Sequence, residues 1–186
     1  KICAGLQRLS QSGVPLFFMA GNRDFLAGDG FASKAGLTLL PDPALVEIAG
    51  ASVLLMHGDT LCTDDDAYQM FRTEVRSPEW RKSFLALPLD QRKAKIEALR
   101  QESEAQKRAK PAEIMDVNPA AVLQVLTSHR CTRLIHGHTH RPALHRLAVA
   151  GEACERWVLP DWYERGGYLA CDASGCRLLE WPPAAV

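Results

Sequence analysis

The segment Val53-Leu54-Leu55-Met56-His57-Gly58-Asp59 joins a short apolar run to a polar turn that contains glycine. Continuous apolar runs bounded by turn residues are typical of strands buried on both faces of a sheet. The same pattern occurs at residues 14–20, followed by Gly21-Asn22-Arg23-Asp24, and at residues 133–135, followed by His136-Gly137-His138-Thr139-His140. Three such strands predict an α/β fold whose polar turns meet at the carboxyl ends of the strands.

Other patterns predict the elements around these strands. Residues 44–56 are expected to form two strands joined by a turn at Gly50. A short helix is expected over Phe31–Ala35, and a longer helix begins at Asn118-Pro119, where Asn is a good N-cap and Pro suits the first helical position. Further short strands are expected at residues 157–159 and 167–170.

A helical insertion is expected between the second and third apolar strands. Residues 71–110 contain eleven Lys or Arg and six Asp or Glu, a local net charge of +5, and residues 91–108 have high helical propensity. The apolar segment 84–89 within it suits either packing on the body of the protein or contact with a lipid surface. The predicted boundaries are 68–110 for the insertion, and 1–67 with 111–186 for the core.

The composition is that of an ordinary globular protein, with 186 residues, 47% of them hydrophobic, and 22 basic and 22 acidic side chains. The zero net charge argues against a dedicated nucleic-acid-binding protein. No apolar run approaches the roughly 20 residues that a membrane-spanning helix needs. The six cysteines contain no C-x-x-C pair and are expected to be reduced thiols in the cytoplasm.

The polar turns contain the donor atoms of a metal site. Asn22, His57, His138 and His140 offer one amide oxygen and three imidazoles, a set that suits a divalent transition metal better than calcium. In an extended stretch His138 and His140 would point to the same side. His136 is left open between ligation and packing, and His129 and His145 are expected to be structural. Arg23 beside Asn22 could clamp phosphate oxygens, which suggests phosphoryl chemistry.

Four motifs resemble those of a known family. They are G-N-R-D-F-L at residues 21–26, M-H-G-D-T-L-C-T-D-D at 56–65, I-M-D-V-N at 114–118 and I-H-G-H-T-H-R-P at 135–142. In this order they resemble the UDP-2,3-diacylglucosamine pyrophosphohydrolases of lipid A biosynthesis, which are calcineurin-like metallophosphoesterases. The resemblance implies a four-layer αββα sandwich with a helical cap insertion and a site for two manganese ions.

The resemblance also implies roles for individual residues. Asn22, His57 and His138 match ligands of one manganese, and His140 matches a ligand of the other. Arg23 and His138 match positions that steady the reacting phosphoryl group. The implied substrate-contacting residues are Asn22, Arg23, Asp65, Ser103, Lys107, Lys110 and His138. For the basic residues of the insertion, a solvated helix face remains an equal alternative.

One part of the family pattern is not found in this sequence. The family also uses an Asp-x-His and a bridging Gly-Asp upstream of the Gly-Asn-Arg-Asp motif, and neither occurs before Gly21. Residues 3–9 look like the end of an amphipathic helix without its start signals. We therefore expect a longer chain, from which the first β-α-β unit is missing here.

The implied reaction is metal-dependent hydrolysis of the pyrophosphate of UDP-2,3-diacylglucosamine, which yields 2,3-diacylglucosamine 1-phosphate (lipid X) and UMP. Because this substrate carries two acyl chains, the enzyme is expected to bind peripherally to the cytoplasmic face of the inner membrane. Two other classes stay open: another metallophosphoesterase that acts on nucleotides or phosphodiesters, and a metal-binding domain without catalytic activity.

Overall fold

A computed structural model describes residues 1–111, 114–163 and 166–182, without the side chains of residues 107 and 109. The chain divides into two compact units: Lys1–Asp59 with Pro119–Val186, and Thr60–Asn118. The insertion predicted from the sequence spans residues 68–110, and these boundaries remain a prediction. Within the described residues, no helix combines the length and the apolar composition that a membrane crossing requires.

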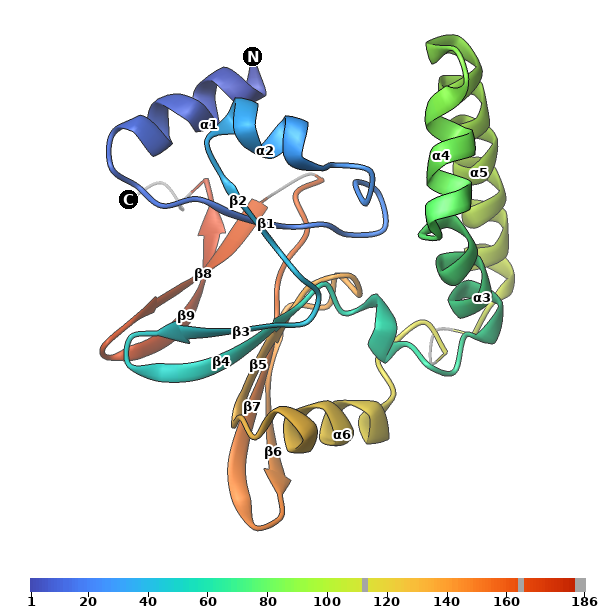
Figure 1. Cartoon of the computed structure of the whole chain (residues 1–186). Coiled ribbons are helices and arrows are strands. Elements are labelled where there is room, and N and C mark those ends of the chain that lie inside the picture. The colour runs from blue at the N-terminus through green and yellow to red at the C-terminus, as the bar shows by residue number, and fades with distance from the viewer. Residues whose placement is uncertain (112–113, 164–165, 183–186) are drawn as a thin grey trace. The chain divides into compact units, whose positions relative to one another are not determined.

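The first unit is built on a mixed sheet of five strands (Figure 1). In sheet order the strands are β3 (Ala44–Ile48), β4 (Ala51–Met56), β5 (Arg133–His136), β7 (Glu152–Val158) and β6 (Ala143–Val149). The central strands β4, β5 and β7 are parallel, and β3 and β6 pair antiparallel at the two edges. This mixed sheet with its helices confirms the predicted α/β class.

The hairpin predicted at residues 44–56 is confirmed. Ala49 and Gly50 form its two-residue loop, with φ of 51° and 78°. Two positive φ angles characterise the type I′ turn, whose twist matches that of the flanking strands. The apolar runs at residues 53–56 and 133–135 lie in central strands as expected, and Val53, Leu54 and Leu134 are fully buried.

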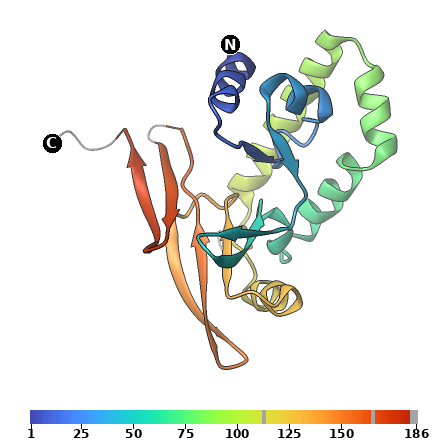
Figure 2. The same cartoon turned by 60° about the vertical axis from the view of Figure 1, so that its left-hand side comes forward.

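Two layers cover the sheet from opposite sides (Figures 1 and 2). The hairpin of β8 (Gly166–Asp172) and β9 (Gly175–Trp181) covers one face, where Leu169 and Leu178 pack against a buried cluster of Val53, Ile135 and Trp157. Helix α6 (Pro119–His129) lies on the other side and buries Val122 and Leu126.

The N-terminal part of this unit contains α1 (Ile2–Gln11), α2 (Asp29–Ala35) and the parallel pair of β1 (Phe17–Met19) and β2 (Thr38–Leu40). The prediction of a doubly buried strand over 14–20 is wrong: β1 has three residues and Phe17 is 61% exposed. Pro15 has no N–H to donate to a strand ladder, which limits the strand at its start. Phe18 packs edge-on against Phe31 of α2, with ring centroids 5.4 Å apart.

The second unit is helical, with α3 (Asp66–Val75), α4 (Pro78–Ala86) and α5 (Leu89–Ala109) after a 3-10 turn at Asp59–Leu61. Ser77 caps α4 by accepting a hydrogen bond from the N–H of Trp80. Phe84 is buried and its ring stacks on that of Trp80, with centroids 4.7 Å apart. Leu85 and Leu89 remain exposed, so the apolar segment 84–89 is only partly used for packing.

Candidate functional site

His57 lies directly after β4, and two carboxylates hold it. Its Nδ1 is 3.2 Å from Oδ1 of Asp59, whose side chain is fully buried. Its main-chain N–H donates a hydrogen bond to Oδ1 of Asp42 over 3.3 Å. The ring and the main chain of His57 are therefore both held by acidic residues.

The Gly21-Asn22-Arg23-Asp24 turn lies against the other nitrogen of His57. A Cβ atom placed on Gly21 would stand 2.6 Å from Nε2 of His57, so the turn can approach the ring this closely only with glycine there. The main-chain N–H of Gly21 donates to Oδ1 of Asp24, which stabilises the turn. Asn22 is half-buried beside it and Arg23 is exposed.

His138 completes this group of residues. Its ring centroid lies 4.9 Å from that of His57, in an edge-to-face arrangement. Strands β4 and β5 are parallel neighbours, with Met56 opposite His136, so their following turns leave the sheet at the same edge. The structure thus brings together the Asn22 turn, His57 and His138 as the sequence predicted, while their roles as metal ligands stay predictions.

The predicted extended geometry of His138 and His140 is wrong. Both residues are in the left-handed region, with φ of 66° and 54°. Directly after the strand, the N–H of Gly137 donates to the main-chain oxygen of His57, and the N–H of Thr139 donates to the main-chain oxygen of Gly137. His140 instead lies beside Asp161, with Nδ1 3.5 Å from Oδ2, and beside the ring of Tyr163.

His136 has a packing role. It is fully buried, and its Nε2 lies 3.2 Å from Nη1 of Arg156 while its Nδ1 lies 2.9 Å from the oxygen of Gly137. A guanidinium can only donate, so Nε2 is the acceptor and Nδ1 carries the proton. Both ring nitrogens are thereby used within the core.

The two other histidines lie on other elements, α6 and β6. Nδ1 of His129 is 2.9 Å from the main-chain oxygen of Val125, one turn earlier in α6. His145 is half-buried on β6, at the edge of the sheet.

The described residues contain one further set of donor atoms that suits a metal ion. Asp42, His57 and Asp59 each offer a ligand atom, and these atoms lie within 4.8 Å of one another. Mixed carboxylate and imidazole donors fit a divalent transition ion. This part of the chain therefore offers donor atoms of the kind that such an ion needs.

Asp42 was missed by the sequence analysis, although a signal existed. The hairpin register pairs Ala44 with Leu55, and two steps further along the same register Asp42 lies opposite His57. Counting back from the predicted turn at Gly50 would have found this neighbour. Asp59 belongs to the His-Gly-Asp string, but the string alone does not show that its side chain is buried.

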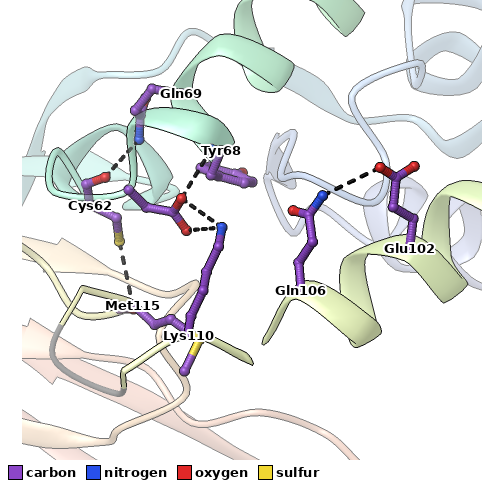
Figure 3. Close-up of polar contacts among 8 residues, drawn as sticks. Cys62, Tyr68, Gln69, Glu102, Gln106, Lys110 and Met115 are labelled. Carbon is purple, nitrogen blue, oxygen red and sulfur yellow. Dashed lines mark hydrogen bonds and ion pairs between the residues drawn. The ribbon is translucent and has the colours of Figure 1, made fainter. Parts of the chain in front are cut away.

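In the helical unit, two residues predicted to contact substrate form an ion pair (Figure 3). Nζ of Lys110 lies 2.6 Å and 2.7 Å from the two carboxylate oxygens of Asp65, although 45 positions separate them. Asp65 also caps α3 by accepting from the N–H of Tyr68. Ser103 is half-buried on α5, and the side chain of Lys107 is outside the described residues. The substrate contacts of these four residues stay predictions.

Comparison with known proteins identifies the family. No family model matches the chain. The UDP-2,3-diacylglucosamine hydrolase of Aromatoleum aromaticum is 51% identical over 181 residues, which cover 97% of this chain and 71% of that protein. Proteins of the same name from Xanthomonas axonopodis pv. citri and an Enterobacter species are 46% identical, and the matches cover 74% and 75% of their lengths. The chain belongs to the family of UDP-2,3-diacylglucosamine hydrolases.

Proposed function

We propose that this protein hydrolyses the pyrophosphate bond of UDP-2,3-diacylglucosamine to 2,3-diacylglucosamine 1-phosphate and UMP, a step of lipid A biosynthesis. The observation that carries the proposal is the meeting of three motif turns. A Cβ atom placed on Gly21 would stand 2.6 Å from Nε2 of His57, and the ring of His138 lies 4.9 Å from that of His57. Membership of a family named for this substrate supports it.

The proposed cofactor is manganese. Asn22, His57 and His138 would hold one ion, and His140 would contribute to a second. A bound divalent metal supplies a water of lowered pKa and neutralises charge on the phosphoryl oxygens. What supports the assignment is the character of the donor set, in which imidazole and amide groups are accompanied by the half-buried carboxylate of Asp42 and the buried carboxylate of Asp59.

The protein's own side chains would bind and orient the diphosphate. Arg23 is exposed next to Asn22, and a guanidinium can form two parallel hydrogen bonds to a phosphate. His138 would stabilise a phosphoryl oxygen by donating a hydrogen bond to it. Asp65, Ser103, Lys107 and Lys110 are proposed to contact the rest of the substrate, with Lys110 exchanging part of its pairing with Asp65 for substrate oxygens.

We also propose that the protein acts at the cytoplasmic face of the inner membrane as a peripheral protein. Residues 71–110 carry a net charge of +5, and Met70, Leu85 and Leu89 of the helical unit are exposed. Basic residues near an anionic membrane surface contribute about 1 kcal/mol each. Sedimentation with vesicles tests this: binding should need anionic lipid and weaken with salt, and equal binding to zwitterionic vesicles would contradict it.

The activity is tested with the purified protein and Mn²⁺ by measuring UMP release from the UDP substrates and p-nitrophenol release from bis(p-nitrophenyl) phosphate. The rate on UDP-2,3-diacylglucosamine should exceed that on bis(p-nitrophenyl) phosphate and on UDP-glucose by about 100-fold or more. That margin corresponds to about 2.7 kcal/mol of differential transition-state binding. Equal rates on the three substrates would favour a general phosphodiesterase. No turnover of any of them would favour a metal-binding domain without activity.

His138→Ala provides the matching site test. It should abolish manganese-dependent turnover and leave the circular dichroism spectrum unchanged, because the side chain is only half-buried. Asp172→Asn, at the exposed tip of the β8–β9 hairpin, is the control and should keep the wild-type rate.

A further inference from the structure

His57 and Asp59 form a carboxylate–imidazole contact at the end of β4. The side chain of Asp59 is 0% exposed and that of His57 is 15% exposed, with 3.2 Å between Nδ1 and Oδ1. Nδ1 itself is inaccessible to solvent, and its contact with Asp59 has the distance of an ion pair without the alignment of a hydrogen bond. A ligand that reaches His57 from solvent therefore meets the edge of the ring that carries Nε2.

The backbone between the two residues fixes this arrangement. Gly58 has a φ of +105°, and a Cβ atom there would lie 2.7 Å from Nδ1 of the buried His136. With no side chain at Gly58, the chain turns tightly and brings Asp59 back beside the ring of His57. Asp42 holds the main-chain N–H of the same histidine. Asp59 therefore lies against one side of the imidazole, and Asp42 holds the main chain of the same residue.

The other nitrogen, Nε2, faces the Gly21-Asn22 turn, as the 2.6 Å approach of a Cβ placed on Gly21 shows. When a carboxylate lies against one nitrogen of an imidazole, the proton is kept there and the other nitrogen becomes a better ligand. We propose that Asp59 is a positioning residue, which keeps the proton on Nδ1 of His57 and presents Nε2 to a divalent metal. This inference rests on the part of the proposed function that makes His57 a ligand.

The same residues allow one competing arrangement. Asp42, His57 and Asp59 could act as three direct ligands of one ion, with Nδ1 as the donor atom of His57. The geometry favours the positioning role, because Nδ1 is inaccessible and Nε2 faces the turn that carries Asn22. The two arrangements differ in which nitrogen binds the metal, and that difference is measurable.

The first experiment measures Mn²⁺ affinity from the signal of free Mn²⁺ in electron paramagnetic resonance. Removal of a carboxylate that supports a metal-bound histidine typically weakens binding 10- to 100-fold. Asp59→Asn should show a loss of that size, whereas the exposed control Asp172→Asn should match the wild type. An unchanged affinity in Asp59→Asn would overturn the inference.

The second experiment needs no variant and therefore stands even if Asp59→Asn does not fold. The ¹⁵N resonances of His57 are recorded in the wild-type protein without metal and with Zn²⁺, which is diamagnetic. The positioning role predicts a proton on Nδ1 in both states. It also predicts that Zn²⁺ shifts the ¹⁵N resonance of Nε2. A metal-shifted Nδ1 would overturn it in favour of the three-ligand arrangement.

These measurements separate the inference from the proposed function. Wild-type protein that binds Mn²⁺ through Nε2 but releases no UMP would contradict the proposed reaction and leave the role of Asp59 standing. Protein that hydrolyses the substrate while Asp59→Asn keeps wild-type affinity would contradict the role of Asp59 alone.

Discussion

The turn after β4 and the loop after β5 each place a histidine against a carboxylate, but in different surroundings. His57 and Asp59 are 3.2 Å apart, with side chains 15% and 0% exposed. His140 and Asp161 are 3.5 Å apart, with side chains 43% and 38% exposed. Charges buried in the protein are screened much less than exposed ones. The buried Asp59 can therefore hold the imidazole of His57 in one orientation, whereas the exposed Asp161 can only favour one orientation of His140.

The largest difference is expected when the histidines themselves are removed. His57→Ala should weaken Mn²⁺ binding on the order of 100-fold or more, because it removes a ligand that is already held in place. His140→Ala should weaken binding about 10-fold, since its ring must be ordered on binding. Calorimetric titration with Mn²⁺ measures both. Equal losses would show that burial does not distinguish the two regions.

A smaller effect is expected from filling the space beside Nε2 of His57. Gly21→Ala would place a methyl group 2.6 Å from that nitrogen, so the ring or the turn has to move. We expect Mn²⁺ binding to weaken about 10-fold and the free energy of unfolding to fall by about 1–3 kcal/mol, the usual cost of overpacking.

Gly5→Ala in α1 is the matched control for this substitution, because nothing lies within 4 Å of the added Cβ. It should leave metal binding unchanged and raise the free energy of unfolding by up to about 1 kcal/mol, since Ala favours a helix over Gly. If both variants bind Mn²⁺ like the wild type, Gly21 is not required for the geometry around His57.

The exposed contact should tolerate loss of its charge. Asp161→Asn is expected to change Mn²⁺ affinity by no more than about 3-fold and the free energy of unfolding by less than about 1 kcal/mol, as for other exposed ion pairs. Both effects should shrink further as salt is added. A 10-fold loss of affinity at 0.15 M salt would mean that Asp161 supports His140 as firmly as Asp59 supports His57.

The smallest expected effect concerns a carboxylate at the surface, far from both histidines along the chain. Hydrogen bonds from Ser174, and then the guanidinium of Arg177, lower the pKa of Asp172 from 3.8 to about 2. Because the folded pKa is the lower one, the stabilisation is present above about pH 4 and is lost as the pH falls toward 2. An NMR titration of the side-chain carboxyl should show this, and Ser174→Ala should raise the pKa toward 3.8.

The parts of the site that could be predicted are those carried by apolar runs. Val53, Leu54 and Leu134 are apolar enough to mark central strands, and parallel neighbours end at one edge, so the proximity of His57 and His138 follows from the pattern. Strand β6 was not predicted, because His145 and Arg146 interrupt the alternation of its apolar residues.

Other parts of the site depend on contacts that the local sequence does not contain. Asp59 follows a turn at Gly58 that packs against His136, and His136 in turn contacts Arg156 on the neighbouring strand β7. The left-handed conformation of His138 and His140 follows from hydrogen bonds of Gly137 and Thr139 rather than from propensity. The spacing of residues in the sequence predicts which side chains lie close together, but tertiary contacts of this kind determine how each side chain is oriented.

The left-handed backbone at His138 and His140 has a consequence for how this loop could change. A non-glycine residue with φ near +60° is strained by on the order of 1 kcal/mol, and Asn tolerates this conformation better than most residues. Replacement of either histidine by Asn would therefore relax the backbone while removing an imidazole. In this loop, the same substitutions would raise thermal stability and remove activity. A screen for thermal stability alone would therefore select inactive variants.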